Sequence, residues 1–197
     1  MRKPFAHFCQ RLQQQIAARP KRSLWKLWSV ATAVLATLLL ASLVFNHFGE
    51  LRSERRQTYS EIADLHVGVL ASANPVDVIS TDRHTVKPWF QGKLPFTFNL
   101  PELQNTDFAL LGGRVTYLGQ APGAHLIYQV RKHQISVFIF QDRDVDQGLE
   151  SNSGPDKDRS FNLQTWSDAG LRYFVIGDAN SGDIGKLADL LKAAGRS

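Results

Sequence analysis

The longest apolar stretch in the chain is the run from Leu27 to Phe45, nineteen residues without a charge. At a helical rise of about 1.5 Å per residue it spans roughly 29 Å, close to the hydrocarbon thickness of a bilayer. A cleaved signal peptide is the alternative, but its apolar core is usually only about 7–15 residues long and ends in small residues. The pattern therefore predicts an uncleaved transmembrane helix within residues 24–48.

Two weaker apolar patterns flank this run. Residues 1–23 form a short tail in which Phe5, Phe8, Leu12 and Ile16 recur at helical spacing before Pro20. The stripe predicts an amphipathic helix of about four turns, which is too short to be stable alone and must rest on the membrane surface or on a partner. Residues 49–73 predict a second, stalk-like helix that ends at Asn74-Pro75.

From residue 74 onward the apolar pattern shifts towards short strands, followed by one last helix. The strands are expected at 76–80, 114–118, 125–130, 135–140 and 172–177, with 135–140 central and buried on both faces. The last helix carries a buried stripe of Ile184, Leu187, Ala188 and Leu191, and Ser181 or Asp183 can cap it. This order predicts an α+β class: a transmembrane helix and a stalk helix, then an antiparallel sheet packed with a C-terminal helix over residues 74–197.

Charge is distributed unevenly along the 197 residues. Residues 1–56 carry ten Lys/Arg against two Glu, whereas residues 57–197 carry 13 basic and 16 acidic residues. The basic excess before the apolar run places the N-terminus in the cytoplasm and the C-terminal domain in the periplasm, anchored in the inner membrane. A mildly acidic domain argues against nucleic-acid binding, and the single Cys permits no internal disulfide.

Sequence motifs for chemistry are lacking, so no catalytic residue, enzymatic activity or cofactor is predicted. No nucleophile elbow, P-loop, Rossmann glycine pattern or metal-ligand spacing occurs. His84, His125 and His133 lack ligand spacing, although a hairpin would let the last two face each other. The acidic segment 142–160 starts like a calcium-binding loop, but the glycine and the bidentate glutamate that such a loop needs are not at the required positions. The pattern therefore predicts a solvated loop.

The densest local signal is the aromatic and cationic segment 84–96. Lys87, Trp89 and Phe90 suit a partner-binding surface, because aromatic residues are favoured at interface hot spots. The alternative is an aromatic plug on the core, with the lysine ammonium groups kept in water.

Four sequence blocks carry a family resemblance: DVISTDRHTVKPWFQGKLPF (77–96), FALLGGRVTYL (108–118), HQISVFIF (133–140) and NLQTWSDAGLRYF (162–174). In this order they resemble the periplasmic domain of bacterial single-pass transmembrane anti-sigma factors. The resemblance implies an inner-membrane protein that holds an extracytoplasmic-function sigma factor until a signal releases it. Members commonly begin with a zinc-binding domain bearing H-x-x-x-C-x-x-C. This tail has only His7 and Cys9, so no zinc is predicted there.

Two functional hypotheses follow from these observations. In the first, the tail helix covers an apolar groove of a sigma factor, and a periplasmic event, such as proteolysis near residues 52–56, ends the contact. In the second, the chain is a membrane-tethered periplasmic module that binds a ligand or a metal without binding sigma, and His84, His125 and His133 matter there.

Overall fold

The computed structural model describes residues 24–145 and 161–196 of the chain. Its first element is the helix α2 (Leu24–Leu70), which covers both the predicted transmembrane helix and the predicted stalk without a break. The chain divides into two compact units, Met1–Gly49 and Glu50–Ser197. Their boundary is close to the predicted start of the stalk at residue 49.

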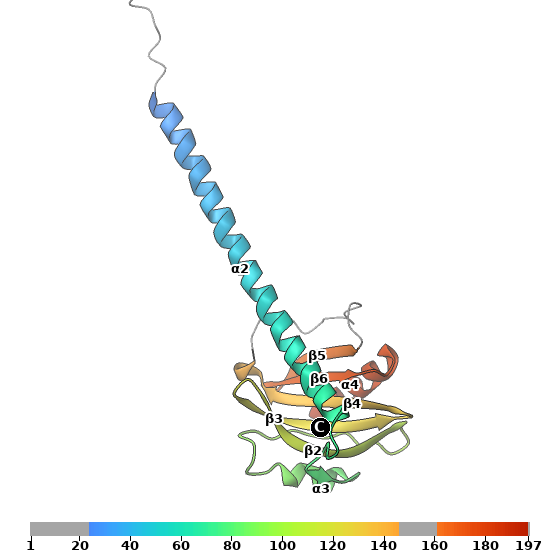
Figure 1. The fold of residues 1–197 in the computed structure, drawn as a ribbon. Coiled ribbons are helices and arrows are strands. Elements are labelled where there is room, and N and C mark those ends of the chain that lie inside the picture. The colour runs from blue at the N-terminus through green and yellow to red at the C-terminus, as the bar shows by residue number, and fades with distance from the viewer. Residues whose placement is uncertain (1–23, 146–160, 197) are drawn as a thin grey trace, which may run out of the picture. The chain divides into compact units, whose positions relative to one another are not determined.

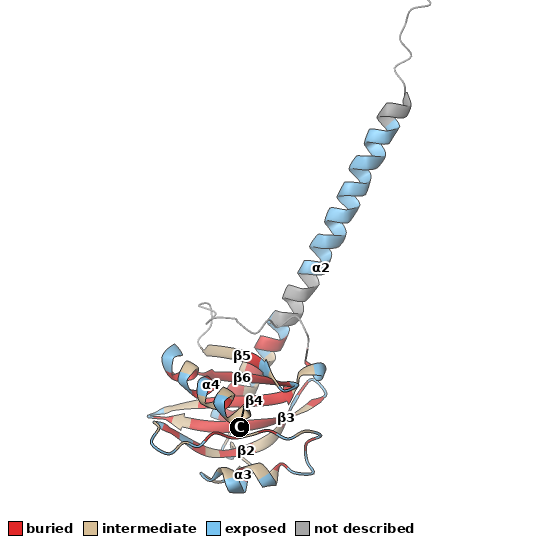
Figure 2. Cartoon of the chain, turned by 180° about the vertical axis from the view of Figure 1, so that it is seen from behind, coloured by how far each residue is buried: buried red, intermediate tan, exposed pale blue. Residues whose placement is uncertain are grey.

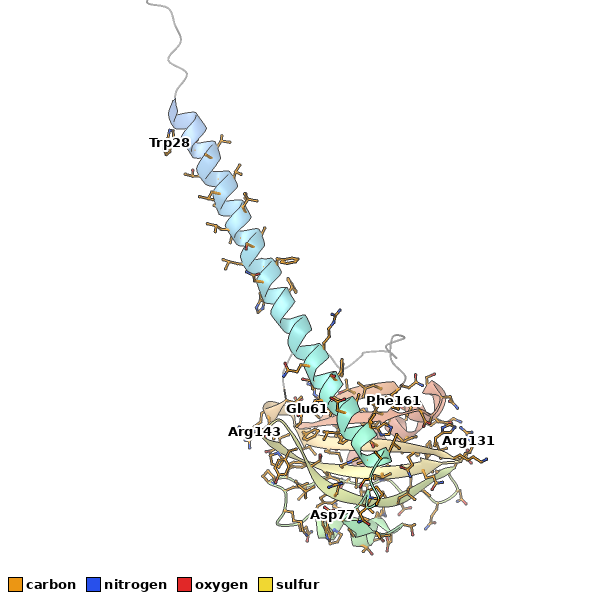
Figure 3. The ribbon with its side chains drawn as sticks, viewed as in Figure 1. Trp28, Glu61, Asp77, Arg131, Arg143 and Phe161 are labelled. Carbon is orange, nitrogen blue, oxygen red and sulfur yellow. The ribbon has the colours of Figure 1, made fainter. Side chains whose placement is uncertain are left out.

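The N-terminal unit contains the part of α2 that is long and apolar enough to cross a membrane, Trp28–Phe48. Its side chains are exposed along the whole 21-residue stretch, and Trp28 lies near its start (Figure 3). The hydroxyls of Thr32 and Thr37 donate to carbonyls three and four residues earlier, so neither remains unsatisfied in an apolar medium. The same length and composition also fit a signal sequence.

The C-terminal unit is built on a six-stranded antiparallel sheet in the order β1-β2-β3-β4-β6-β5 (Figure 1). Its strands are β1 (Val78–Ile79), β2 (Phe108–Leu118), β3 (Ala121–Val130), β4 (His133–Gln141), β5 (Asn162–Asp168) and β6 (Leu171–Gly177). Its described residues also include the end of α2, the helix α3 (Arg83–Trp89), the 3-10 turn η1 (Asp142–Asp144) and the helix α4 (Ser181–Gly195). The α+β prediction is confirmed.

The two faces of the sheet support two cores of unequal size, because successive side chains of a strand point to opposite faces. On one face Val137 and Ile139 join a large core that includes α4 and Phe90. On the other face Phe138 and Phe140 join a smaller core, which the end of α2 covers. Figures 1 and 2 show α2 and α4 on opposite sides of the sheet.

The predicted central strand is confirmed: β4 lies between β3 and β6, and every residue of 135–140 is buried. The predicted strand 76–80 is longer than β1, whereas the other predicted strands are shorter than the observed ones, and some observed elements were not predicted at all. β2 begins at Phe108, six residues before the predicted start, and β5 and α3 were not predicted. The α4 cap is Asn180, whose side chain accepts from the Asp183 amide, in place of Ser181 or Asp183.

The register of the β3–β4 hairpin shows whether His125 and His133 face each other. His133 is opposite Val130 in the β3–β4 hairpin, and His125 is opposite Phe138. The two imidazoles therefore do not face each other across the turn, because five residues separate them along β3.

Candidate functional site

The first candidate site is the segment of α3, which holds the three predicted partner-binding residues of the domain. Asp82 caps the helix by accepting from the His84 amide at 2.8 Å. Phe90 is only 3 % exposed and belongs to the large core, so its ring offers no surface to a partner. For Phe90 the structure supports the alternative, an aromatic plug on the core.

Trp89 and Lys87 keep part of their surface in solvent. Trp89 packs edge-on against Phe90 at 5.0 Å, and the Lys93 ammonium lies 3.9 Å from the centre of the Trp89 ring. Lys93 Nζ also donates to the Trp89 carbonyl at 2.7 Å. This cation–π contact orders an aromatic side chain at the surface, as an interface residue requires.

A groove of about 720 Å³ lies between α3, residues 99–102 and the end of α4. Arg83, His84 and Lys87 supply its basic side chains, and Glu102 is its only acidic one. Arg83 forms an ion pair with Glu102, and Lys87 donates to Asn99 at 2.8 Å. The groove therefore has a basic excess held in a fixed arrangement, which suits a small anion such as a carboxylate.

The second candidate site is a buried polar cluster under α2, formed by His66, His125 and Ser136. His66 Nδ1 lies 2.7 Å from Ser136 Oγ, and His125 Nε2 lies 2.8 Å from the same oxygen. All three residues are at most 1 % exposed. They join three elements that are distant in sequence, namely α2, β3 and β4.

Aromatic rings surround these imidazoles. His125 stacks on Phe138 with 4.1 Å between ring centres, and His66 meets Phe161 edge-on at 5.0 Å. Burial lowers the pKa of His66 to about 4, which the charge of Asp178 partly offsets. Burial also lowers the pKa of His125 to about 3, and the charges of His66 and Arg114 lower it further. Both imidazoles are neutral at neutral pH.

The sequence predicts the helix that carries His66, but it does not reveal the partners of this side chain. Two signals were available: a histidine within the apolar stripe of a helix, and a lone serine inside the apolar run 135–140. Neither indicates pairing, because 70 residues separate His66 from Ser136.

The histidines of the metal-binding hypothesis lie in different environments. His125 is buried, His84 is exposed on α3, and His133 Nδ1 is 3.1 Å from Asp178 Oδ2. Within residues 24–145 and 161–196, no three His, Cys, Asp or Glu side chains lie close enough to hold a metal ion.

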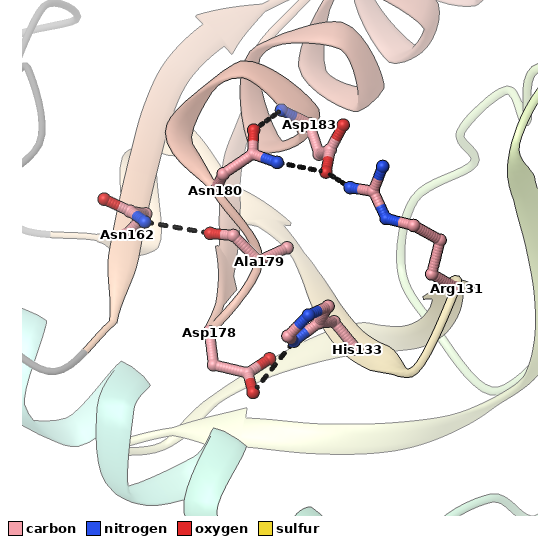
Figure 4. Close-up of polar contacts among 7 residues, drawn as sticks. All are labelled: Arg131, His133, Asn162, Asp178, Ala179, Asn180 and Asp183. Atoms are coloured by element: carbon pink, nitrogen blue, oxygen red, sulfur yellow. Dashed lines mark hydrogen bonds and ion pairs between the residues drawn. The ribbon is translucent and has the colours of Figure 1, made fainter.

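Polar contacts next to α4 have a structural role (Figure 4). Arg131, in the β3–β4 turn, forms an ion pair with Asp183 in the first turn of α4. Asn180 Nδ2 donates to the same carboxylate at 2.6 Å. These contacts attach the hairpin to the start of α4.

The tail residues Phe5, Phe8, Leu12 and Ile16 lie outside the described part of the chain, as do His7 and Cys9. Most of the acidic segment, 146–160, also lies outside it. Asp142, which precedes that segment, accepts from Arg172 Nε and from Ser167 Oγ, each at 2.7 Å.

Comparison with known proteins gives no relative for this chain. No protein-family model, no curated protein and no solved structure matches it.

Proposed function

We propose that this chain is a membrane-anchored transcriptional regulator of the anti-sigma type. Its short N-terminal tail would sequester a sigma factor in the cytoplasm, and its C-terminal domain would respond to a signal on the other side of the inner membrane. The chain would act by binding alone, without enzymatic activity.

The observation that carries the proposal is the continuity of α2. Its apolar part, Trp28–Phe48, has the length of a membrane span, and its last turns bury Tyr59, Ile62 and Val69 in the C-terminal unit. A regulator that responds across a membrane needs an element shared by its anchor and its sensing domain, and α2 meets this need.

The four blocks that resemble anti-sigma factors support the same proposal. They coincide with β1 and α3, with β2, with β4, and with β5 and the start of β6. They thus supply much of the sheet and the basic side chains of the groove.

Sigma binding is testable on the full chain. We would solubilise membranes in detergent, capture the chain and identify the retained proteins by mass spectrometry, with and without residues 2–20. A sigma factor retained only with the tail is expected. Leu12→Asp should abolish retention, because it places a charge in the apolar stripe, whereas Gln13→Asp carries the same charge on the opposite face and should not. Retention of the same sigma factor without the tail, or by Leu12→Asp, would refute the tail model.

The groove supports a second candidate function, a membrane-tethered module that binds a small anionic ligand. Its basic excess and its volume of about 720 Å³ are the observations in favour. The full chain in detergent would be heated with a panel of small dicarboxylates, and a bound anion should raise the melting temperature. Lys87→Ala should remove that increase, and a panel without effect on the melting temperature would count against this function.

A further inference from the structure

The His66–Ser136–His125 cluster lies where the end of α2 meets the sheet. Tyr59 and Ile62 lie one to two helical turns before His66 and are buried in the smaller core. Val69 follows His66 by three residues and is also buried. His66 is thus a titratable side chain within a mostly apolar contact surface, which also includes the buried Thr58 and the Glu61 carboxylate that accepts from the Gly119 amide at 2.7 Å.

When both imidazoles are neutral, the number of available protons determines which group donates in each hydrogen bond of the cluster. The Ser136 hydroxyl holds one proton and can donate to one imidazole, so the other imidazole must donate an N–H to Ser136 Oγ. His66 Nε2 is buried and has no hydrogen-bond partner among residues 24–145 and 161–196. A lone pair is cheaper to leave there than an N–H, so we assign the donor role to His66 Nδ1–H and the acceptor role to His125 Nε2.

An added proton has no suitable place in this arrangement. At His66 Nε2 it would form a charged N–H that meets no hydrogen-bond acceptor in the part of the chain that the structure describes. At His125 Nε2 it would replace the proton that Ser136 donates. Either position also adds a charge to a buried site, which is costly without a partner.

The charged groups around the cluster do not compensate for an added proton. Asp178, which follows β6, is the acidic group that acts on His66, but it is half exposed and already pairs with His133 from β4. Arg114 from β2 and His66 from α2 both act on His125 against protonation. No carboxylate in the described residues hydrogen-bonds either imidazole of the cluster.

We propose that this cluster is an acid-sensitive latch: protonation of His66 and His125 releases the end of α2 from the sheet, while the large core on the opposite face stays folded. The proposal concerns the C-terminal unit alone and stands independently of sigma binding. It makes mild acid a signal that changes the chain next to its membrane-spanning segment.

The direction and size of the effect follow from proton linkage. Each imidazole has a lower pKa when docked, about 4 for His66 and about 3 for His125, than the ordinary 6.5 it regains in water. The docked state is thus fully favoured above about pH 6.5 and loses stability as pH falls from there towards the docked values. Between about pH 7.5 and pH 5, the undocking equilibrium should rise roughly thirtyfold for each histidine that reaches water, and roughly a thousandfold for both.

Thiol labelling of the full chain in detergent micelles measures this equilibrium. In a Cys9→Ser background, Val69→Cys places a thiol in the buried contact, and Val67→Cys places one on the exposed side of the same helix. A pyridyl disulfide, which still reacts in mild acid, labels each variant. Dividing the labelling rate of Val69→Cys by that of Val67→Cys cancels the intrinsic pH dependence of thiol chemistry. We expect this ratio of rates to rise roughly thirty- to thousandfold on going from about pH 7.5 to pH 5.

Three further variants separate the latch from general acid unfolding. Ala188→Cys places a thiol in the large core under α4, and its labelling should stay slow over the same range. Adding His66→Leu should make the rise of the Val69→Cys to Val67→Cys labelling ratio roughly thirtyfold smaller. His84 is exposed, so adding His84→Gln should leave the rise of that ratio unchanged. A ratio independent of pH, an unchanged rise in His66→Leu, or equal acceleration at Ala188→Cys would each overturn the proposal.

Histidine-ring NMR on the unsubstituted chain covers the case in which His66→Leu fails to fold. The buried His66 and His125 rings should remain neutral until the pH at which Val69→Cys becomes reactive. If either ring titrates near its ordinary pKa while the Val69→Cys thiol stays protected, the cluster is not a latch.

Discussion

Gly123 provides the sharpest test of the packing between the sheet and α2. A Cβ on Gly123 would lie 2.3 Å from two atoms of the Phe140 ring and 2.8 Å from the Ile139 carbonyl oxygen, whereas ordinary contact begins at 3.4 Å. Phe140 is fully buried against the rings of Phe138 and Phe174. The ring would have to retreat by about 1 Å into a region that is already filled.

The expected cost of Gly123→Ala follows from these contacts. Overpacking of a core costs about 1–3 kcal/mol, and one clash here is with backbone, which favours the upper part of that range. Replacing a strand glycine recovers about 0.5–1 kcal/mol of backbone entropy. The net loss is about 2 kcal/mol, which lowers the melting temperature of a unit of this size by roughly 4–8 °C. Thermal unfolding of the full chain in micelles, followed by near-ultraviolet circular dichroism, measures the shift.

A matched substitution and a double mutant make the reasoning refutable. Gly185 lies within α4 and a Cβ there would meet nothing within 4 Å, so Gly185→Ala should stabilise the protein by about 0.5–1 kcal/mol. Combining Gly123→Ala with Phe140→Leu should cost less than the two single changes added together, because the smaller side chain leaves room for the Cβ. A wild-type melting temperature for Gly123→Ala, or strictly additive costs, would show that the ring does not restrict this position.

Two smaller predictions use the same thermal assay. Asn180→Ala removes the α4 cap, which bonds the Asp183 amide at 2.9 Å, and should cost about 1 kcal/mol, whereas Asn180→Ser should retain most of that stability; equal losses would contradict a capping role. The buried hydroxyl of Tyr128 has no partner within the described ranges 24–145 and 161–196, so Tyr128→Phe should be neutral or stabilising, whereas Thr165→Val loses a bond to the Tyr173 carbonyl and should cost about 1 kcal/mol. A clear loss of stability in Tyr128→Phe would indicate that its hydroxyl has a partner.

The parts of the fold that the sequence predicts are those where local pattern and tertiary environment agree. The apolar run 135–140 became the buried central strand, and the stripe of α4 faces the large core. β5 was missed because Asn162–Asp168 has weak alternation and lies at the sheet edge, where only its register with β6 orders it.

The first half of β2 was not predicted because it contains two glycines. Gly112 and Gly113 lower strand propensity, yet a Cβ at Gly112 would lie 2.1 Å from the Val78 carbonyl oxygen. Gly112 accommodates the close approach of β1, whereas a Cβ at Gly113 would lie 2.9 Å from the Phe90 ring. Both are tertiary requirements that no local pattern reveals.

The candidate sites show the same limit. Composition singled out the segment of α3 as a candidate site, but it could not separate Trp89, which keeps solvent contact, from Phe90, which lies in the core. The histidine cluster depends on contacts across 70 and 11 residues, and such pairs follow only from the topology of the sheet.

The unequal cores explain why the latch belongs on the side of α2. Regions with fewer buried apolar contacts open at lower free-energy cost than the main core. The large core joins α4, α3 and one face of the sheet, whereas among the described residues of α2 only Tyr59 and Ile62 are buried apolar members of the smaller core. If a titratable cluster were buried in the large core, its protonation would have to break many apolar contacts to release a helix. In the smaller core it acts against few, so protonation can release the helix that continues from the apolar segment while the rest of the C-terminal unit remains folded.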